Sequence, residues 1–346
     1  MAVKKSRLKV GIGTSINEDA VLAADEAAKA AIQQCGGKPD FSIVYVDSKY
    51  NPKKVLKGFN GHLGKNWIGC STDSQSISDV GYFKGGISVI SIKSEHLHFG
   101  VGYVENYKKN PIKSGEAAIK KALDKVKIDQ YLNPYVQFRR VQTKKFEDIV
   151  RTPPYFILSM LTGVQSVAGK QEPGRETGFV EGIFNVTGPN IPVIGGSASS
   201  DLDKFLKENK TNIFHFAEGK LLKNAAITVF VVSDLYFSTD VEHGYTKSKE
   251  IALVTKIDET GHEILEINNK PSLAEYARLV GITKEQLLKD PFKYTFQRPL
   301  GVIDTNGYIF IKEWMPNEDG KTMHSLMKVV ENSAVNVVNY DKSKTI

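Results

Sequence analysis

The chain has 346 residues, of which 41% are hydrophobic and 25% are charged, and its formal net charge at pH 7 is +7. This composition is typical of a globular protein, and the length exceeds the range in which one hydrophobic core keeps growing, so two domains are expected. The basic residues are mostly lysines spread along the chain rather than gathered in one tract, which argues against a nucleic-acid partner.

No targeting or membrane segment is predicted. The residues after the basic amino terminus include Gly11, Gly13 and Thr14, which do not make the apolar centre of a signal peptide. The longest apolar runs have the length of a strand, far below the roughly 20 residues of a membrane helix. The two cysteines, Cys35 and Cys70, favour a reducing compartment. We therefore expect a soluble, cytoplasmic protein that does not bind a membrane.

The first 92 residues alternate between strand and helix patterns, which is typical of an α/β fold. Alanines recur at helical spacing after the first strand, and the pair Gly36 and Gly37 ends that helix. Asn51 and Pro52 begin the second helix, because Asn caps helices and Pro suits the first turn. In chain order, we predict a strand at 8–13, a helix at 20–32, a strand at 41–46, a helix at 51–63, and strands at 67–72 and 86–92.

The next stretch repeats this order. Its predicted elements are a strand at 97–103, a helix at 114–126, a strand at 155–161, a helix at 176–184, and strands at 192–198 and 225–232. The tetrapeptide that starts at Ile68 has a similar counterpart at Ile194, 126 residues later, whereas Phe41 and Tyr155 start strands only 114 residues apart. We therefore predict an internal duplication with insertions. The copies cover about 8–92 and 97–236 within a first domain, 1–236, of layered mixed β-sheets flanked by helices.

After residue 236 the pattern changes to a smaller α/β domain over 237–346. Alternating apolar positions at 251–257 and 263–267, joined by a turn, predict a hairpin. A helix over 272–280 ends at Gly281. A further helical segment at 283–288 and a strand at 308–314, which follows a turn at 304–307, complete the predicted elements.

Three segments together resemble the FIST family. Ile68-Gly69-Cys70-Ser71-Thr72 and Ile194-Gly195-Gly196-Ser197-Ala198 are similar to the FIST amino-terminal domain, and His243-Gly244-Tyr245 is similar to the start of the carboxy-terminal domain. The family pattern continues further than this chain, so an incomplete carboxy-terminal domain is expected. The resemblance implies a sensory module of signal transduction that binds a small molecule such as an amino acid, or haem in some members, and that acts on a signalling partner.

Each copy contains a buried strand that ends in glycine and small polar residues. Such an end lets a ligand approach the backbone, and its NH groups and hydroxyls suit a carboxylate. The candidate ligand-binding residues are Gly69, Cys70, Ser71 and Thr72 in the first copy, and Gly195, Gly196, Ser197 and Ala198 in the second. Arg175, at the start of a second-copy helix, is a candidate partner for a ligand carboxylate. The alternative is that these glycines only permit close packing.

Two of these residues, Cys70 and Ser71, are weak catalytic candidates for hydrolysis of a small amide, because both follow Gly69 at a strand end. No sequence feature places a histidine near Cys70, and no lysine partner of Ser71 can be identified. Binding is therefore expected rather than catalysis.

The histidines suggest few ligand sites. His243 is a candidate for the ligand cleft or for axial ligation of haem, and the alternative is an exposed histidine at the domain junction. His96 and His98 alternate along one strand, but no third ligand accompanies them, so no metal is expected. A protein-recruiting adaptor is the remaining alternative function.

Overall fold

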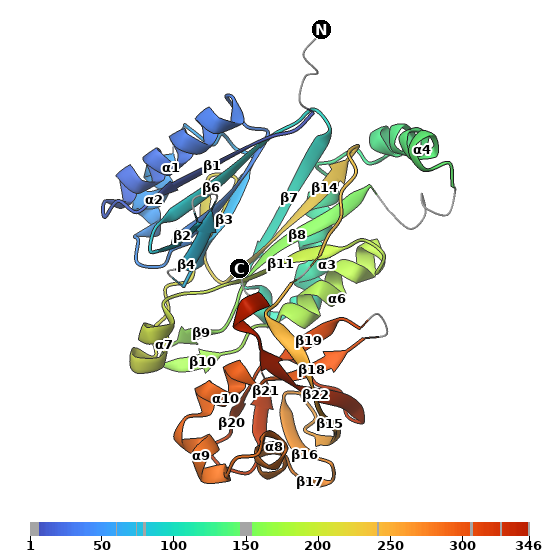
Figure 1. The fold of residues 1–346 in the computed structure, drawn as a ribbon. Coiled ribbons are helices and arrows are strands. Elements are labelled where there is room, and N and C mark those ends of the chain that lie inside the picture. Colours follow the sequence, from blue (N-terminus) through green and yellow to red (C-terminus); the bar gives the residue numbers. More distant parts are fainter. Residues whose placement is uncertain are drawn as a thin grey trace. The chain divides into compact units, whose positions relative to one another are not determined.

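Strands and helices alternate through the first 233 residues, as the sequence predicts (Figure 1). The structure is a computed structural model that describes residues 7–59, 61–73, 75–78, 81–145, 154–240, 242–304, 307–325 and 327–344. The chain divides into two compact units, Met1–Thr239 and Asp240–Ile346, where the sequence predicted a boundary near residue 237. Both units are layered α/β structures, which confirms the predicted fold class.

The first copy builds a main sheet, a separate two-stranded sheet of β4 and β5, and two helices. Its elements are β1 (Lys9–Ser15), α1 (Ala20–Cys35), β2 (Phe41–Asp47), α2 (Pro52–Phe59), β3 (Trp67–Thr72), β4 (Gln75–Ser78), β5 (Gly81–Lys84) and β6 (Ile87–Lys93). The main sheet, called here the first sheet, has the order β1-β6-β2-β3. β2 and β3 are parallel and the other neighbours are antiparallel. The helix predicted to reach residue 63 ends at Phe59.

The second copy begins at β7 and carries more insertions. Its elements are β7 (Leu97–Glu105), a 3-10 turn η1 (Tyr107–Lys109), α3 (Pro111–Leu123), α4 (Asp129–Thr143), β8 (Tyr155–Thr162), β9 (Gln165–Val167), β10 (Lys170–Glu172), α6 (Glu176–Thr187), β11 (Val193–Ala198), α7 (Leu202–Glu208), β12 (His215–Ala217), β13 (Lys220–Leu222) and β14 (Ala225–Ser233). Its sheet, the second sheet, has the order β7-β14-β8-β11.

The strand order and directions of the two sheets match position by position. β7, β14, β8 and β11 correspond to β1, β6, β2 and β3, and β8 and β11 are the parallel pair. Ser42 lies opposite Trp67 and Ile157 lies opposite Val193, which gives offsets of 115 and 126 residues between the copies. The structure therefore shows the predicted duplication. The offset between β2 and β8 is 115 residues, one more than the 114 predicted from the sequence.

Paired glycines set the helix packing in both copies. A Cβ at Gly13 of β1 would lie 2.0 Å from the Ala27 carbonyl oxygen of α1, and one at Gly102 of β7 would lie 1.9 Å from the Ala118 oxygen of α3. These distances are far below van der Waals contact, so only glycine lets the alanine-rich helix faces approach the strands so closely. Asp19 caps α1 by accepting from two backbone NH groups, as expected for a helix start.

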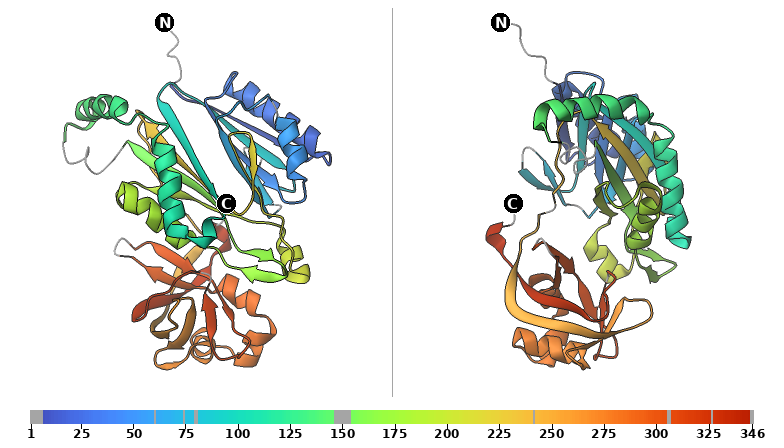
Figure 2. Two further views of the ribbon diagram at one scale, coloured as in Figure 1. Left: turned by 180° about the vertical axis from the view of Figure 1, so that it is seen from behind. Right: turned by 90° about the vertical axis from the view of Figure 1, so that its right-hand side faces the viewer.

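The two sheets lie between two helix layers, as Figure 1 and the left view of Figure 2 show. α1 and α2 cover the outer face of the first sheet, where their side chains pack with Val44, Val89 and Trp67. α3 and α6 cover the outer face of the second sheet. A third core fills the space between the sheets, and Ile68 and Met160 belong to it. Apolar burial on both faces explains why the inner strands are hydrophobic along their whole length.

One hairpin from the second copy joins the first sheet. β12 pairs with β3 and with β13, so the full order is β1-β6-β2-β3-β12-β13. No sequence pattern predicted this pairing, because β12 has only three residues and lies more than 140 residues after β3.

The second unit is built on one antiparallel sheet. Its elements are β15 (Tyr245–Ile257), β16 (Glu263–Ile267), β17 (Lys270–Pro271), α8 (Ser272–Val280), α9 (Lys284–Lys289), α10 (Pro291–Gln297), β18 (Leu300–Ile303), β19 (Ile309–Lys312), β20 (Trp314–Pro316), β21 (Met323–Ser325), β22 (Ser333–Tyr340) and η2 (Lys342–Lys344). The predicted hairpin and the helix that ends at Gly281 are present. The strand predicted at 308–314 is two strands separated at Glu313, and the turn predicted before it includes residues outside the described ones. In the described part of the chain, no helix is long and apolar enough to cross a membrane.

Candidate functional site

The two glycine-containing strand ends predicted from the sequence occupy equivalent positions. Gly69 of β3 lies beside Val44 of β2, and Gly195 of β11 lies beside Ser159 of β8. A Cβ would lie 2.7 Å from the Val44 oxygen at Gly69 and 1.8 Å from the Ser159 oxygen at Gly195, where φ is +140°. Close approach of the parallel neighbour therefore explains both glycines without a ligand.

Ser71 joins the two copies at this end of the sheets. Its hydroxyl donates to the Ser199 carbonyl oxygen at 2.7 Å and accepts from the Phe214 NH at 3.3 Å, and its carbonyl accepts from the Ser199 NH at 3.3 Å. The strand ends thus lie close together, but the Ser71 side chain is buried and occupied by backbone groups. Thr72, next to it, is half-buried. These contacts favour a structural role for Ser71.

Cys70 lies in the core between the sheets, directly opposite His215 of β12. No sequence pattern places a histidine near Cys70, and the pairing of β3 with β12 corrects the expectation that none lies there. Burial raises the pKa of the Cys70 thiol to about 12 and lowers the pKa of the His215 imidazole to about 4. Both groups are therefore neutral near pH 7, whereas a nucleophilic cysteine needs a thiolate and access to its substrate.

The equivalent end in the second copy is more open. Gly195, Gly196 and Ser197 are exposed, and Ala198 is buried in the core between the sheets. The Ser197 hydroxyl donates to Glu176, the first residue of α6, at 2.6 Å. Arg175 precedes that residue, and its NH donates to the Tyr107 hydroxyl at 3.4 Å. This end therefore offers exposed polar groups.

A buried lysine lies behind this second-copy end. The Lys108 ammonium donates to the Gly163 carbonyl oxygen at 2.7 Å and lies 3.5 Å from Glu172. Burial lowers the pKa of Lys108, while Glu172 opposes that shift. These contacts of the ammonium group are with other residues of the chain, which indicates a structural role for Lys108.

His243 belongs to the second unit. Its Nε2 lies 2.8 Å from the Ile309 carbonyl oxygen, and its Nδ1 accepts from the Tyr245 NH at 3.2 Å. Both ring nitrogens are therefore bound to the backbone, and axial ligation of haem would have to break one of these bonds. Among the residues that the structure describes, no group of three or more His, Cys, Asp or Glu side chains is placed to hold a metal ion.

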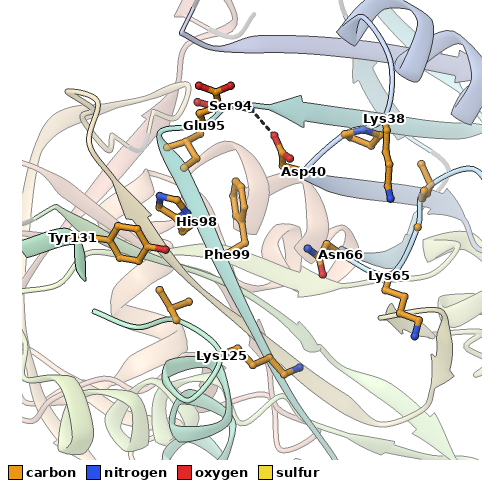
Figure 3. Close-up of a pocket in the computed structure, with 15 residues that line it drawn as sticks. Lys38, Asp40, Lys65, Asn66, Ser94, Glu95, His98, Phe99, Lys125 and Tyr131 are labelled. Atoms are coloured by element: carbon orange, nitrogen blue, oxygen red, sulfur yellow. Dashed lines mark hydrogen bonds between the residues drawn. The ribbon is translucent and has the colours of Figure 1, made fainter. Parts of the chain in front are cut away.

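A cavity in the first unit lies at the opposite ends of these strands, where β2, β3 and β7 begin (Figure 3). Its volume is about 800 Å³, within the range of small-molecule sites. It is lined by Lys38, Pro39, Asp40, Leu63, Gly64, Lys65, Asn66, Ser94, Glu95, Leu97, His98, Phe99, Lys125, Val126 and Tyr131. The lining comes from both copies, and its residues are different from those predicted for a ligand site.

Three lysines give this cavity a cationic side. Lys38 and Lys65 are exposed and have no carboxylate partner among the described side chains, whereas Lys125 pairs with Glu218 in the β12–β13 turn. The Asp40 carboxylate, which also lines the cavity, accepts a hydrogen bond from the Ser94 NH at 2.8 Å, and this bond holds the acidic side chain in place. Free ammonium groups beside a concave surface suit an anionic ligand.

Aromatic rings form another part of the wall. Phe99 stacks on Phe41 with centroids 4.4 Å apart, and His98 stacks on Tyr131 at 3.9 Å. Burial lowers the pKa of His98, and Asp234 opposes the shift. In Figure 3, His98 and Tyr131 lie on one side of Phe99, and Lys38 and Lys65 lie on the other. No local sequence pattern pointed to this cavity, because its lining residues are scattered over short loops and strand starts.

Comparisons with known proteins agree with the resemblance noted in the sequence. The model of the FIST N domain matches residues 40–270, which extends past the end predicted at 236 and includes β15 and β16. No match supports the expected carboxy-terminal FIST domain, which stays a prediction. No curated protein matches the chain.

Among solved structures, a crystal structure of cyanuric acid hydrolase from A. caulinodans is similar over 65% of this chain and 71% of its own, with 9% identity and a TM-score of 0.32. A similarity of that size supports no conclusion about fold or activity. The FIST N domain match covers well over half of the chain. The chain therefore belongs to the FIST family, a sensory domain family of signal transduction.

Proposed function

We propose that this chain is a sensory module that binds a small anionic metabolite, carrying a carboxylate as in an amino acid or organic acid, in the cavity lined by Lys38, Lys65 and Lys125. The observation that carries the proposal is the cavity itself, which lies between the copies and presents two lysines without a carboxylate partner among the described residues. Family membership supports the sensory role. The bound state would then act on a separate signalling partner.

Ligand binding is measured as thermal stabilisation, because a ligand of the native state raises its free energy of unfolding. A screen of amino acids and organic acids is expected to contain at least one compound that raises the melting temperature in a concentration-dependent way. For that compound, Lys38→Ala with Lys65→Ala is expected to raise the Kd roughly 2- to 30-fold, since each exposed ion pair contributes about 0.2–1 kcal/mol. Lys120→Ala, an exposed lysine outside the cavity, is the matched control.

The pair between Lys125 and Glu218 offers a second variant with the opposite effect. Glu218→Gln leaves Lys125 without its carboxylate partner, so an anionic ligand no longer competes for that ammonium. Exposed ion pairs contribute about 0.2–1 kcal/mol, which corresponds to binding that is roughly 1.5- to 5-fold tighter. If no compound stabilises the protein, or if the lysine variants bind as well as the control, the proposed function is wrong.

A further inference from the structure

The cavity is larger than a free amino acid requires. Its volume of about 800 Å³ lies in the upper part of the roughly 300–1,000 Å³ range of pockets that enclose drug-sized ligands. A small aliphatic acid would leave most of this space filled with water. A ligand that fills the cavity therefore has a bulky uncharged part in addition to its charged group.

The wall opposite the lysines is made of rings whose planes are fixed by stacking. Phe99 lies nearly parallel to Phe41, with an interplanar angle of 8°, and His98 lies against Tyr131 at 25°. The side chains of His98, Phe99 and Tyr131 are half-buried, so part of each remains accessible. Rings held in this way present flat apolar surface, which favours a flat ring in the ligand.

Lys38, Lys65, Asn66 and the Asp40 carboxylate lie on the other side of Phe99 (Figure 3). Lys38 and Lys65 reach the cavity from the loops that precede β2 and β3, and the Asn66 amide lies between these lysines and Phe99 in Figure 3. Lysine recognises carboxylates and phosphates alike as a point charge, without a fixed geometry. The two lysines outnumber the Asp40 carboxylate there, so the cavity combines a flat apolar side with a side of net positive charge.

We propose that the occupant is a planar aromatic or heteroaromatic ring that carries a carboxylate or phosphate group. The ring lies against Phe99 and the His98–Tyr131 pair, and the anionic group lies at Lys38 and Lys65. This inference rests on the proposed function and specifies its ligand class. The anion can belong to an aromatic acid or to a nucleotide, and the test separates these two sources.

The test is calorimetric titration of the full chain with two matched pairs of compounds. Indole-3-acetate is compared with cyclohexylacetate, which keeps the carboxylate and loses the planar ring. Adenosine 5′-monophosphate is compared with ribose 5-phosphate, which keeps the phosphate and loses the base. In at least one pair, the planar member is expected to bind at least tenfold tighter, because stacking of a base on an aromatic side chain is worth about 1–3 kcal/mol. The pair that shows the preference identifies the source of the anion.

Variants locate the ring within the cavity. Tyr131→Leu and Phe99→Leu are each expected to remove most of the preference for the planar compound, while Tyr82→Leu, an exposed tyrosine outside the cavity, leaves it unchanged. Circular dichroism confirms that each variant is folded, and Tyr131 is the safer position because it lies on α4 rather than in a sheet.

The outcomes separate the two proposals. Equal binding of planar and saturated members, or a preference that survives both variants, overturns the ring inference and leaves the anion sensor standing. Failure of all four probes, when an aliphatic acid binds in the stability screen, overturns the ring inference alone. Failure of every probe and every acid overturns both proposals.

Discussion

The two copies of the first unit share one strand order and differ at one sheet edge. In the first copy β3 is covered by β12, so Cys70 and Ser71 are buried. In the second copy β11 is the edge strand of its sheet as described, and the equivalent residues Gly196 and Ser197 are exposed. The covering strand β12 is itself part of the second copy, so one copy completes the sheet of the other.

This difference shows what a duplicated motif retains. Both copies keep a glycine at the point where two parallel strands approach closely, at Gly69 and Gly195. They do not keep the surroundings of the following polar residues, because those depend on which segment covers the strand. A shared motif therefore indicates shared packing, and the ligand-binding role first predicted for these residues remains a prediction in both copies.

The prediction with the largest expected effect tests whether the glycines are needed for close packing of the parallel strands. Gly195→Ala places a Cβ against the Ser159 oxygen in a left-handed conformation and is expected to cost roughly 3 kcal/mol of unfolding free energy, from overpacking and backbone strain together. Gly196→Ala meets no atom within 4 Å and is expected to change stability by less than about 0.5 kcal/mol. Urea denaturation measures both, and equal effects would show that strand packing does not explain the motif.

The next effect concerns His215, the buried histidine that β12 of the second copy places beside Cys70 of the first copy. The pKa of His215 is about 4 in the folded chain, below the 6.5 of an ordinary histidine. Between these two pH values the unfolded chain binds a proton at His215 more readily than the folded chain does. The free energy of unfolding therefore falls as the pH is lowered from 6.5 towards 4. Between pH 6.5 and 5, this one group is expected to lower the free energy of unfolding by about 1.6 kcal/mol.

His215→Phe is expected to remove that part of the pH dependence. Denaturation curves of the natural protein and the variant at pH 6.5 and pH 5 give the comparison. A variant that loses as much stability as the natural protein over this interval would show that His215 is not held neutral by burial.

The smallest expected effect compares the serines at equivalent positions. Ser71→Ala leaves the Phe214 NH and the Ser199 carbonyl without their side-chain partner and is expected to cost about 1.5 kcal/mol. Ser197→Ala removes an exposed hydroxyl and is expected to cost less than about 0.5 kcal/mol. The hydrolase hypothesis instead requires Ser71→Ala to leave the melting temperature nearly unchanged while abolishing turnover. Thermal denaturation of both variants decides between these expectations.

Local patterns in the sequence predicted most of the regular elements. The alanine spacing of α1, its stop at Gly36 and the hairpin of β15 and β16 follow from residues within one element or one turn. The repeated glycine motif also revealed the duplication, because both copies require the same close strand contact at Gly69 and Gly195. Helix periodicity, capping and turn chemistry act over a few residues, so a single sequence is sufficient to recognise them.

The tertiary structure alone decided the surroundings of these residues and the position of the cavity. Cys70 meets His215 because a three-residue strand of the second copy pairs with β3, and nothing local in 215–217 specifies that partner. Lys38, Lys65 and Tyr131 approach one cavity although they come from three separate segments. The physical reason is that pairing across long separations is selected by the total apolar surface that the two sheets bury together, which no short segment contains.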